Sequence, residues 1–181
     1  MLSILLAHVF AGSNYDWTKN TISDLGAQGY ERKLIMQLGF IVFGLTLVLG
    51  HLFTGLTWRT SAILVYAICV ALTGVFCTKP FVGIEAFSNT QSNLHSIFAQ
   101  IAGIAFSIGI LTQVFFASNN QLKYIHVAFF ILVISLSATF GFVKSYQGIV
   151  QRLLYLSSFI WLIKYYKPWF TVKINMHQKL E

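Results

Sequence analysis

The polar residues best suited to chemistry are few, and they lie between long apolar runs. The segment 14–29 holds Asn20, Ser23 and Asp24, and the polar run 88–93 leads directly to His95. A histidine near a carboxylate and a hydroxyl can act as acid or base, and the same groups bind polar ligands. The candidates for catalysis are His95, Asp24 and Ser23. The candidates for binding are Asn20, Ser23, Asp24, His95 and Arg152.

Each of these residues also has a purely structural interpretation. Ser23 can cap a helix that contains Asp24, which makes the segment a capped interfacial loop. A histidine at the start of a helix is often a structural hydrogen-bonding group, as His95 would be. Asp24 needs a cation if it is partly buried. The predicted partner is Arg152, because arginine offers a two-pronged fork to a carboxylate, with Lys79 and Lys144 as weaker alternatives.

The cysteines and histidines do not have the spacing of a metal site. Cys69 and Cys77 are eight residues apart in one apolar run, about 12 Å along a helix, which is too far for a disulfide. No Cys/His pattern has zinc spacing, and no two histidines are four residues apart. We predict no metal and no cofactor.

The composition excludes a soluble globular protein. Of 181 residues, 12 are Lys or Arg and 5 are Asp or Glu, so 9% are charged and 56% are hydrophobic. Soluble domains have roughly 25% charged residues, so this chain cannot cover a water-facing surface. The basic residues that produce the net charge of +7 are scattered singly. They form no basic face for nucleic acid, and membrane lipids are the expected partners.

The apolar runs predict an all-α, polytopic transmembrane helical bundle. Five segments reach the length of about 20 residues that a spanning helix needs, namely 34–55, 60–80, 95–117, 123–143 and 148–167. The first apolar segment, 2–11, has ten residues and would be a short half-span of about 15 Å. We expect one transmembrane domain over residues 1–170 and a polar, basic tail over 171–181.

The connections between these segments predict where the polar residues gather. Successive spanning helices reverse direction, so the connections 12–33, 78–94 and 144–147 must share one membrane face. The two faces have equal numbers of basic residues, so the count alone does not set the orientation. The C-terminal lysines favour a cytoplasmic tail, and the expected location is the bacterial cytoplasmic membrane. Small residues at a spacing of four predict helix-packing faces, at Ala99, Gly103 and Ser107 and again at Ser137 and Gly141.

Four motifs in this order resemble a known family. They are Asn20-Thr-Ile-Ser-Asp-Leu-Gly-Ala27, Gly74-Val-Phe76, His95-Ser-Ile-Phe98 and Gly148-Ile-Val-Gln-Arg152. The chain is similar, over nearly its whole length, to the bacterial and archaeal multipass membrane family catalogued as domain of unknown function 998. The resemblance implies a six-helix bundle with a polar loop after the first helix and a histidine that opens the fourth, but it implies no activity.

Two positions depart from the family pattern. The family's first helix is full length, so the ten-residue start implies a chain begun late or a truncated member. The proline expected soon after Gly74 and Phe76 is displaced to Pro80, and Cys77 stands in its place.

Three functions follow from these observations. The leading interpretation is a lipid-interacting or partner-binding membrane component with a polar cluster on one face, whose protein partner the sequence does not identify. The first alternative is a membrane-embedded enzyme acting on a lipid or lipid-linked substrate, and the second is a small transporter. The sequence leaves open whether the protein is an enzyme.

Overall fold

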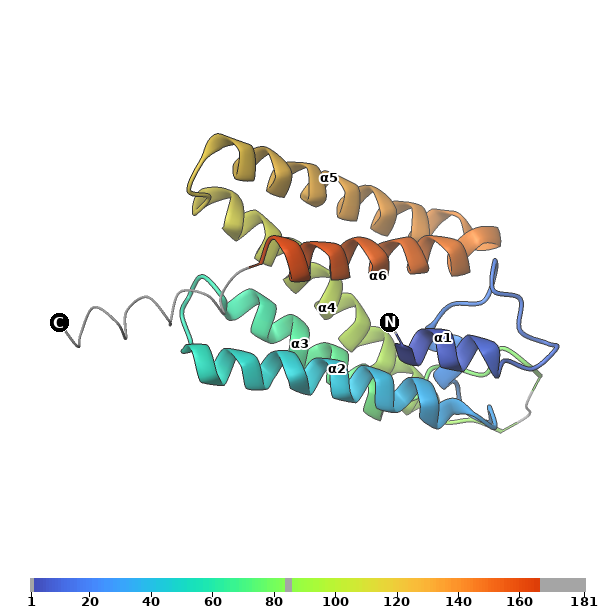
Figure 1. Ribbon diagram of the computed structural model, residues 1–181. Helices are drawn as coiled ribbons and strands as arrows, with labels where there is room; N and C mark the ends of the chain where they lie inside the picture. Colours follow the sequence, from blue (N-terminus) through green and yellow to red (C-terminus); the bar gives the residue numbers. More distant parts are fainter. Residues whose placement is uncertain (1, 84–85, 167–181) are drawn as a thin grey trace.

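The computed structural model describes residues 2–83 and 86–166, and these residues form helices joined by loops (Figure 1). The predicted all-α class is confirmed. The predicted tail, 171–181, lies outside the described residues. The elements in chain order are α1 (Leu2–Val9), η1 (Ser23–Gly26), α2 (Lys33–Thr54), α3 (Ser61–Val75), α4 (Asn89–Phe115), α5 (Asn120–Phe142), η2 (Lys144–Tyr146) and α6 (Gln147–Lys164).

Three of these helices, α2, α4 and α5, are long and apolar enough to cross a membrane. Five full spans were predicted, and the other two predicted spans are shorter than expected. The helix expected over 60–80 is α3, which has 15 residues and a length of about 22 Å, less than the hydrocarbon thickness of about 30 Å. It ends because Phe76 is extended, and Pro80 lies only four residues beyond. The last helix, α6, has 18 residues.

Helices that follow one another in sequence lie side by side, from α2 with α3 through to α5 with α6, and α1 lies along α2 (Figure 1). The connections that follow α1, α3 and α5, at 10–32, at 76–83 with 86–88, and at 143–146, meet at one end of the bundle, as the alternation of helix direction predicts. We call this end the loop face.

The glycines that allow close helix packing differ from the predicted ones. A Cβ on Gly44 would lie 2.5 Å from the Ala67 carbonyl oxygen, and one on Gly74 would lie 2.6 Å from that of Gln37, so α2 and α3 approach closely only through glycine. Four of the five predicted packing residues are instead exposed, and Ser107 alone is buried. A spacing of four places small residues on one helix face, but it does not say whether that face meets protein or lipid. The exposed four are Ala99, Gly103, Ser137 and Gly141.

Candidate functional site

The first loop is docked on the N-terminus of α6. The backbone N–H groups of Gly148 and Ile149 donate to the carbonyl oxygens of Lys19 and Thr18, at 3.1 and 3.2 Å. The first N–H groups of a helix have no partner within the helix, and here the carbonyl oxygens of the loop are their acceptors. Gly148 is required for this contact, because a Cβ there would lie 2.9 Å from the Thr18 carbonyl oxygen and closer still to that of Asn20.

Arg152 holds the same loop from the next turn of α6. Its Nη1 donates to the carbonyl oxygens of Trp17, Asn20 and Gly148 at 2.9, 3.2 and 2.8 Å. Its Nη2 lies 2.6 Å from the Tyr15 hydroxyl. The predicted ion pair between Arg152 and Asp24 is therefore wrong. Because carbonyl oxygens occur at every residue, the sequence gives no sign that they, and not a carboxylate, are the acceptors.

Asp24 is satisfied within its own loop. Its Oδ2 accepts from the Thr21 N–H at 2.7 Å, and its N–H donates to the Thr21 hydroxyl at 3.1 Å. This reciprocal pair has the form of a capping box at the start of η1. The cap is Thr21, whereas Ser23 was the predicted cap. Burial raises the pKa of the Asp24 carboxyl above its ordinary value, against the opposing effect of the hydrogen bonds from Thr21.

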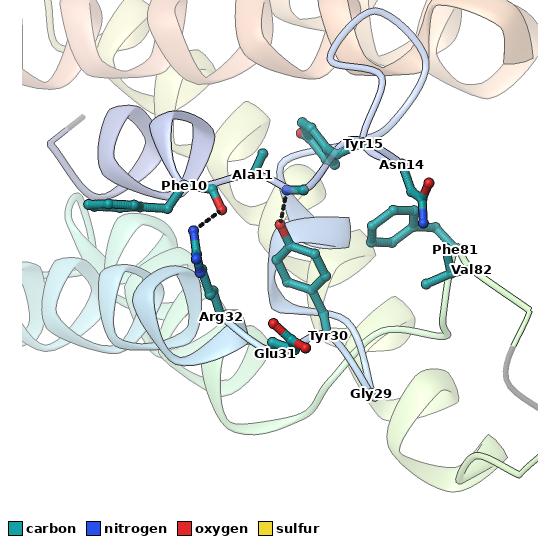
Figure 2. A pocket seen from close by; sticks show the side chains of 11 residues that line it. Phe10, Ala11, Asn14, Tyr15, Gly29, Tyr30, Glu31, Arg32, Phe81 and Val82 are labelled. Carbon is teal, nitrogen blue, oxygen red and sulfur yellow. Dashed lines mark hydrogen bonds between the residues drawn. The ribbon is translucent and has the colours of Figure 1, made fainter.

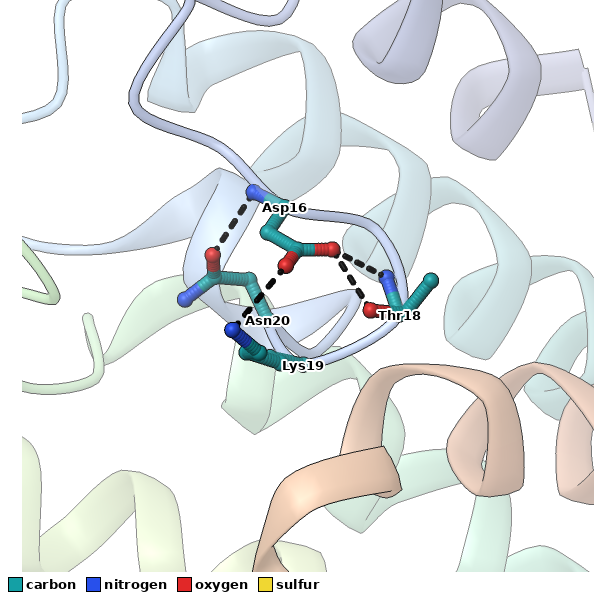
Figure 3. A network of polar contacts seen from close by, with 4 residues as sticks. All are labelled: Asp16, Thr18, Lys19 and Asn20. Carbon is teal, nitrogen blue, oxygen red and sulfur yellow. Dashed lines mark hydrogen bonds and ion pairs between the residues drawn. The ribbon is translucent and has the colours of Figure 1, made fainter.

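A second carboxylate shapes the tip of the loop (Figure 3). Asp16 Oδ1 accepts from the N–H and the hydroxyl of Thr18 at 2.9 and 2.6 Å, and its Oδ2 lies 3.6 Å from Lys19 Nζ. The side-chain oxygen of Asn20 accepts from the Asp16 N–H at 2.9 Å. The hydrogen bonds from Thr18 hold the pKa of Asp16 below its ordinary value. Asn20 is thus part of the loop's internal structure.

Gln151 provides a further link between the loop and α6. Its side-chain oxygen accepts from the Ile22 N–H at 2.5 Å, and its Nε2 lies 3.5 Å from the Ser23 hydroxyl. Ile22 and Leu25 are fully buried and belong to the hydrophobic core of the bundle, so apolar packing anchors the loop beneath these polar contacts.

His95 joins α4 to the end of α3. The ring is buried, and its Nδ1 lies 3.0 Å from the carbonyl oxygen of Thr73 and 2.8 Å from that of Phe76. Both neighbours are acceptors, so Nδ1 carries the proton and donates. The last carbonyl groups of a helix have no partner within the helix, and His95 supplies one for α3. This arrangement matches the structural interpretation of His95.

The remaining loop contacts tie the first connection to the second. The Gln28 N–H donates to the Thr78 carbonyl at 3.1 Å. The Gln28 side chain also exchanges two hydrogen bonds with the backbone of Ser88, at 2.9 and 2.7 Å. The first connection is therefore hydrogen-bonded both to the second connection and to the start of α6, and these segments form one layer at the loop face.

A pocket of about 450 Å³ opens in this layer (Figure 2). Arg32 Nη1 donates to the Phe10 carbonyl oxygen at 2.8 Å, and the Gly12 N–H donates to the Tyr30 hydroxyl at 3.1 Å. In Figure 2 these two side chains reach from the 29–32 segment to the 10–12 segment and form one side of the pocket. The Phe81 ring packs on Tyr15 and Tyr30, with centroids 5.9 and 5.5 Å apart. The lining is completed by Ala11, Asn14, Gly29, Glu31 and Val82.

The predicted site residues thus share one end of the bundle but line no common cavity. Asn20, Ser23, Asp24 and Arg152 build the loop and attach it to α6, and His95 caps α3. None of these five lines the pocket. Two other buried histidines, His51 and His126, lie on the far ends of α2 and α5.

The pocket residues were missed because their signals are weak in sequence. Tyr30 and Arg32 lie in the run Gly29-Tyr-Glu-Arg-Lys33, and Phe81 stands between Pro80 and Val82. Aromatic residues and arginines in such surroundings are common at any membrane interface. Among residues 2–83 and 86–166, no group of three or more His, Cys, Asp or Glu could hold a metal ion. Cys69 and Cys77 are buried, free thiols.

Comparison with known proteins identifies the family. No curated protein and no solved structure matches the chain. The family model described as protein of unknown function, DUF998, matches residues 1–165, which is most of the sequence and contains all four motifs. The chain therefore belongs to this family of proteins of unknown function, DUF998.

Proposed function

We propose that this protein is a multipass component of the bacterial cytoplasmic membrane that binds a lipid headgroup at its loop face. The observation that carries the proposal is the pocket of about 450 Å³ between the end of α1 and the segments 29–32 and 81–82. This volume falls in the range of about 300–1,000 Å³ that is usual for small-molecule sites. Its lining combines aromatic rings with one arginine.

The surroundings of the pocket fit an amphiphile better than a fully water-soluble ligand. Val9 at the end of α1 and Leu34 at the start of α2 are 75% and 63% exposed, and each lies two residues or fewer from a lining residue. A ligand with a polar head in the pocket can therefore rest its chains on apolar protein surface and in the surrounding lipid.

The enzyme alternative has less support. A general base must reach the substrate proton, yet the Nδ1 of His95 is engaged by α3 and Asp24 is engaged by Thr21. Neither residue borders the pocket. Nothing among the described residues favours the small transporter.

The test is retention of lipid by a variant that carries a bulkier side chain at a residue of the pocket lining. Gly12 lines the pocket, and a Cβ placed on it meets no atom within 4 Å. Gly12→Leu therefore adds a side chain in open space without a clash. We expect native mass spectrometry during stepwise delipidation to show one phospholipid that persists on the wild type and is lost early from Gly12→Leu.

Gly83→Leu is the matched control. Gly83 is an exposed loop glycine where an added Cβ would likewise meet no atom within 4 Å, and it does not line the pocket. Its variant should keep the lipid as the wild type does. Equal retention by Gly12→Leu and the wild type would contradict the proposed function.

A further inference from the structure

We infer that the pocket selects a zwitterionic headgroup, in which a phosphodiester is followed by an ammonium group. This inference rests on the proposed function and names the ligand class of the same site. The argument starts from the two charged residues that line the pocket, Glu31 and Arg32, which have opposite signs.

Arg32 supplies the phosphate contact. Its hydrogen bond to the Phe10 carbonyl uses Nη1, and a guanidinium has five N–H donors. Its other donors remain available, because no further contact of Arg32 is made by hydrogen bond or ion pair within residues 2–83 and 86–166. The Phe10 contact fixes the guanidinium at the edge of the pocket, where a planar fork suits phosphate oxygens.

Glu31 and the aromatic rings supply the ammonium contact. Within the described chain the Glu31 carboxylate has no ion pair, since the only pair there joins Lys19 to Asp16. Tyr30 and Phe81 place two rings beside the same space, and ring faces attract cations. The third ring of the lining, Tyr15, already has the Arg152 guanidinium over it. A carboxylate beside aromatic rings recognises an ammonium group and disfavours a second anion.

The charge balance of the pocket excludes the simpler ligand classes. An anionic headgroup would satisfy Arg32 but would leave Glu31 facing a like charge. A lone ammonium compound would leave the guanidinium without an anion. Glu31 and Arg32 both line the pocket and are adjacent in sequence, and a phosphoethanolamine group carries both complementary charges on one short headgroup.

The test compares two lipids that differ only in the headgroup. Delipidated full-length protein in maltoside detergent is titrated with didecanoyl phosphatidylethanolamine and with didecanoyl phosphatidylglycerol, and binding is followed by native mass spectrometry. We expect the wild type to bind the ethanolamine lipid about tenfold more tightly. Glu31→Gln should abolish this preference by weakening ethanolamine binding alone, and Arg32→Gln should weaken both lipids.

The controls are Asp16→Asn and Lys33→Gln, which remove the same charges from residues that do not line the pocket. Both should keep the preference. Equal binding of the two lipids, unchanged in Glu31→Gln, would overturn the selectivity and leave headgroup binding intact. If the wild type bound neither lipid, both proposals would be overturned. If free phosphoethanolamine bound as tightly as the lipid, the ligand would be soluble and the lipid assignment would be wrong.

Discussion

Arg152 Nη2 lies 2.6 Å from the hydroxyl of Tyr15, across 137 positions of sequence. The same hydroxyl lies 2.9 Å from the Thr21 carbonyl oxygen, to which it donates. Tyr15 therefore accepts from α6 and donates to its own loop, and its ring also packs on Phe81 beside the pocket. Through this one side chain, the attachment of the loop to α6 also fixes a wall of the pocket.

Removal of the Arg152 guanidinium should detach the first loop from α6. Hydrogen bonds to charged groups contribute about 1.5–3 kcal/mol each, so Arg152→Ala should lower the stability by roughly 2 kcal/mol or more. Arg152→Lys should recover little, because a lysine is a point charge that cannot reach separated acceptors at once. Lys19 lies in the loop with its side chain 68% exposed, and trypsin cleavage after Lys19 should be faster in both variants.

Lys144→Ala is the control, since Lys144 is an exposed basic residue at the same end of the bundle. It should leave cleavage at Lys19 unchanged. The exchange of charges between Asp24 and Arg152 should not rescue either single variant, because the two side chains are not paired. A rescue would restore the ion pair that the structure excludes.

Alanine substitutions at Gly148 and Gly141 should change the stability of the protein in opposite directions. Gly148→Ala places a Cβ against three carbonyl oxygens of the loop, and forced overpacking costs about 1–3 kcal/mol. Gly141 has no atom within 4 Å of its Cβ position, so Gly141→Ala should stabilise α5 by about 0.5–1 kcal/mol. Thermal unfolding in detergent measures both. Equal effects of the two substitutions would show that the loop does not pack on α6 as described.

Asp24 should make the stability depend on pH. Its pKa in the folded protein is raised, so the folded state binds the proton more tightly than the unfolded state does. Stability is therefore gained as the pH falls through the raised pKa and lost as the pH rises through it. As the pH falls from about 7 to about 5, the thermal-unfolding midpoint of the wild type should rise relative to that of Asp24→Asn.

Asp16→Asn separates this effect from that of the neighbouring carboxylate. The pKa of Asp16 is lowered, so its contribution is present above the ordinary carboxyl range and is lost only as the pH falls below it. Between about pH 7 and pH 5, this variant should keep the pH dependence of the wild type. Equal pH dependence of the wild type and Asp24→Asn would contradict the raised pKa of Asp24.

The helical class and the meeting of the polar loops at one end follow from composition and from the alternation of helix direction. These features depend on the chain as a whole, so single residues cannot obscure them. The partners of Arg152, Asp24 and His95 are different, because each contacts the backbone or a near neighbour. The pocket was also beyond prediction, since Tyr30, Arg32 and Phe81 come together only through the path of two loops.

Two substitutions of His95 distinguish a structural role of this residue from a catalytic one. Its Nδ1–H donates to carbonyl oxygens at the end of α3, and the amide nitrogen of asparagine stands as many bonds from Cα as Nδ1 does. His95→Asn should therefore keep the stability and any lipid binding, although asparagine cannot titrate. Glutamine carries its nitrogen one bond further out, so His95→Gln should leave these carbonyl groups unpaired and lower the stability by about 1–3 kcal/mol. Thermal unfolding of the two variants measures the difference, and loss of function in a stable His95→Asn protein would instead assign His95 to chemistry.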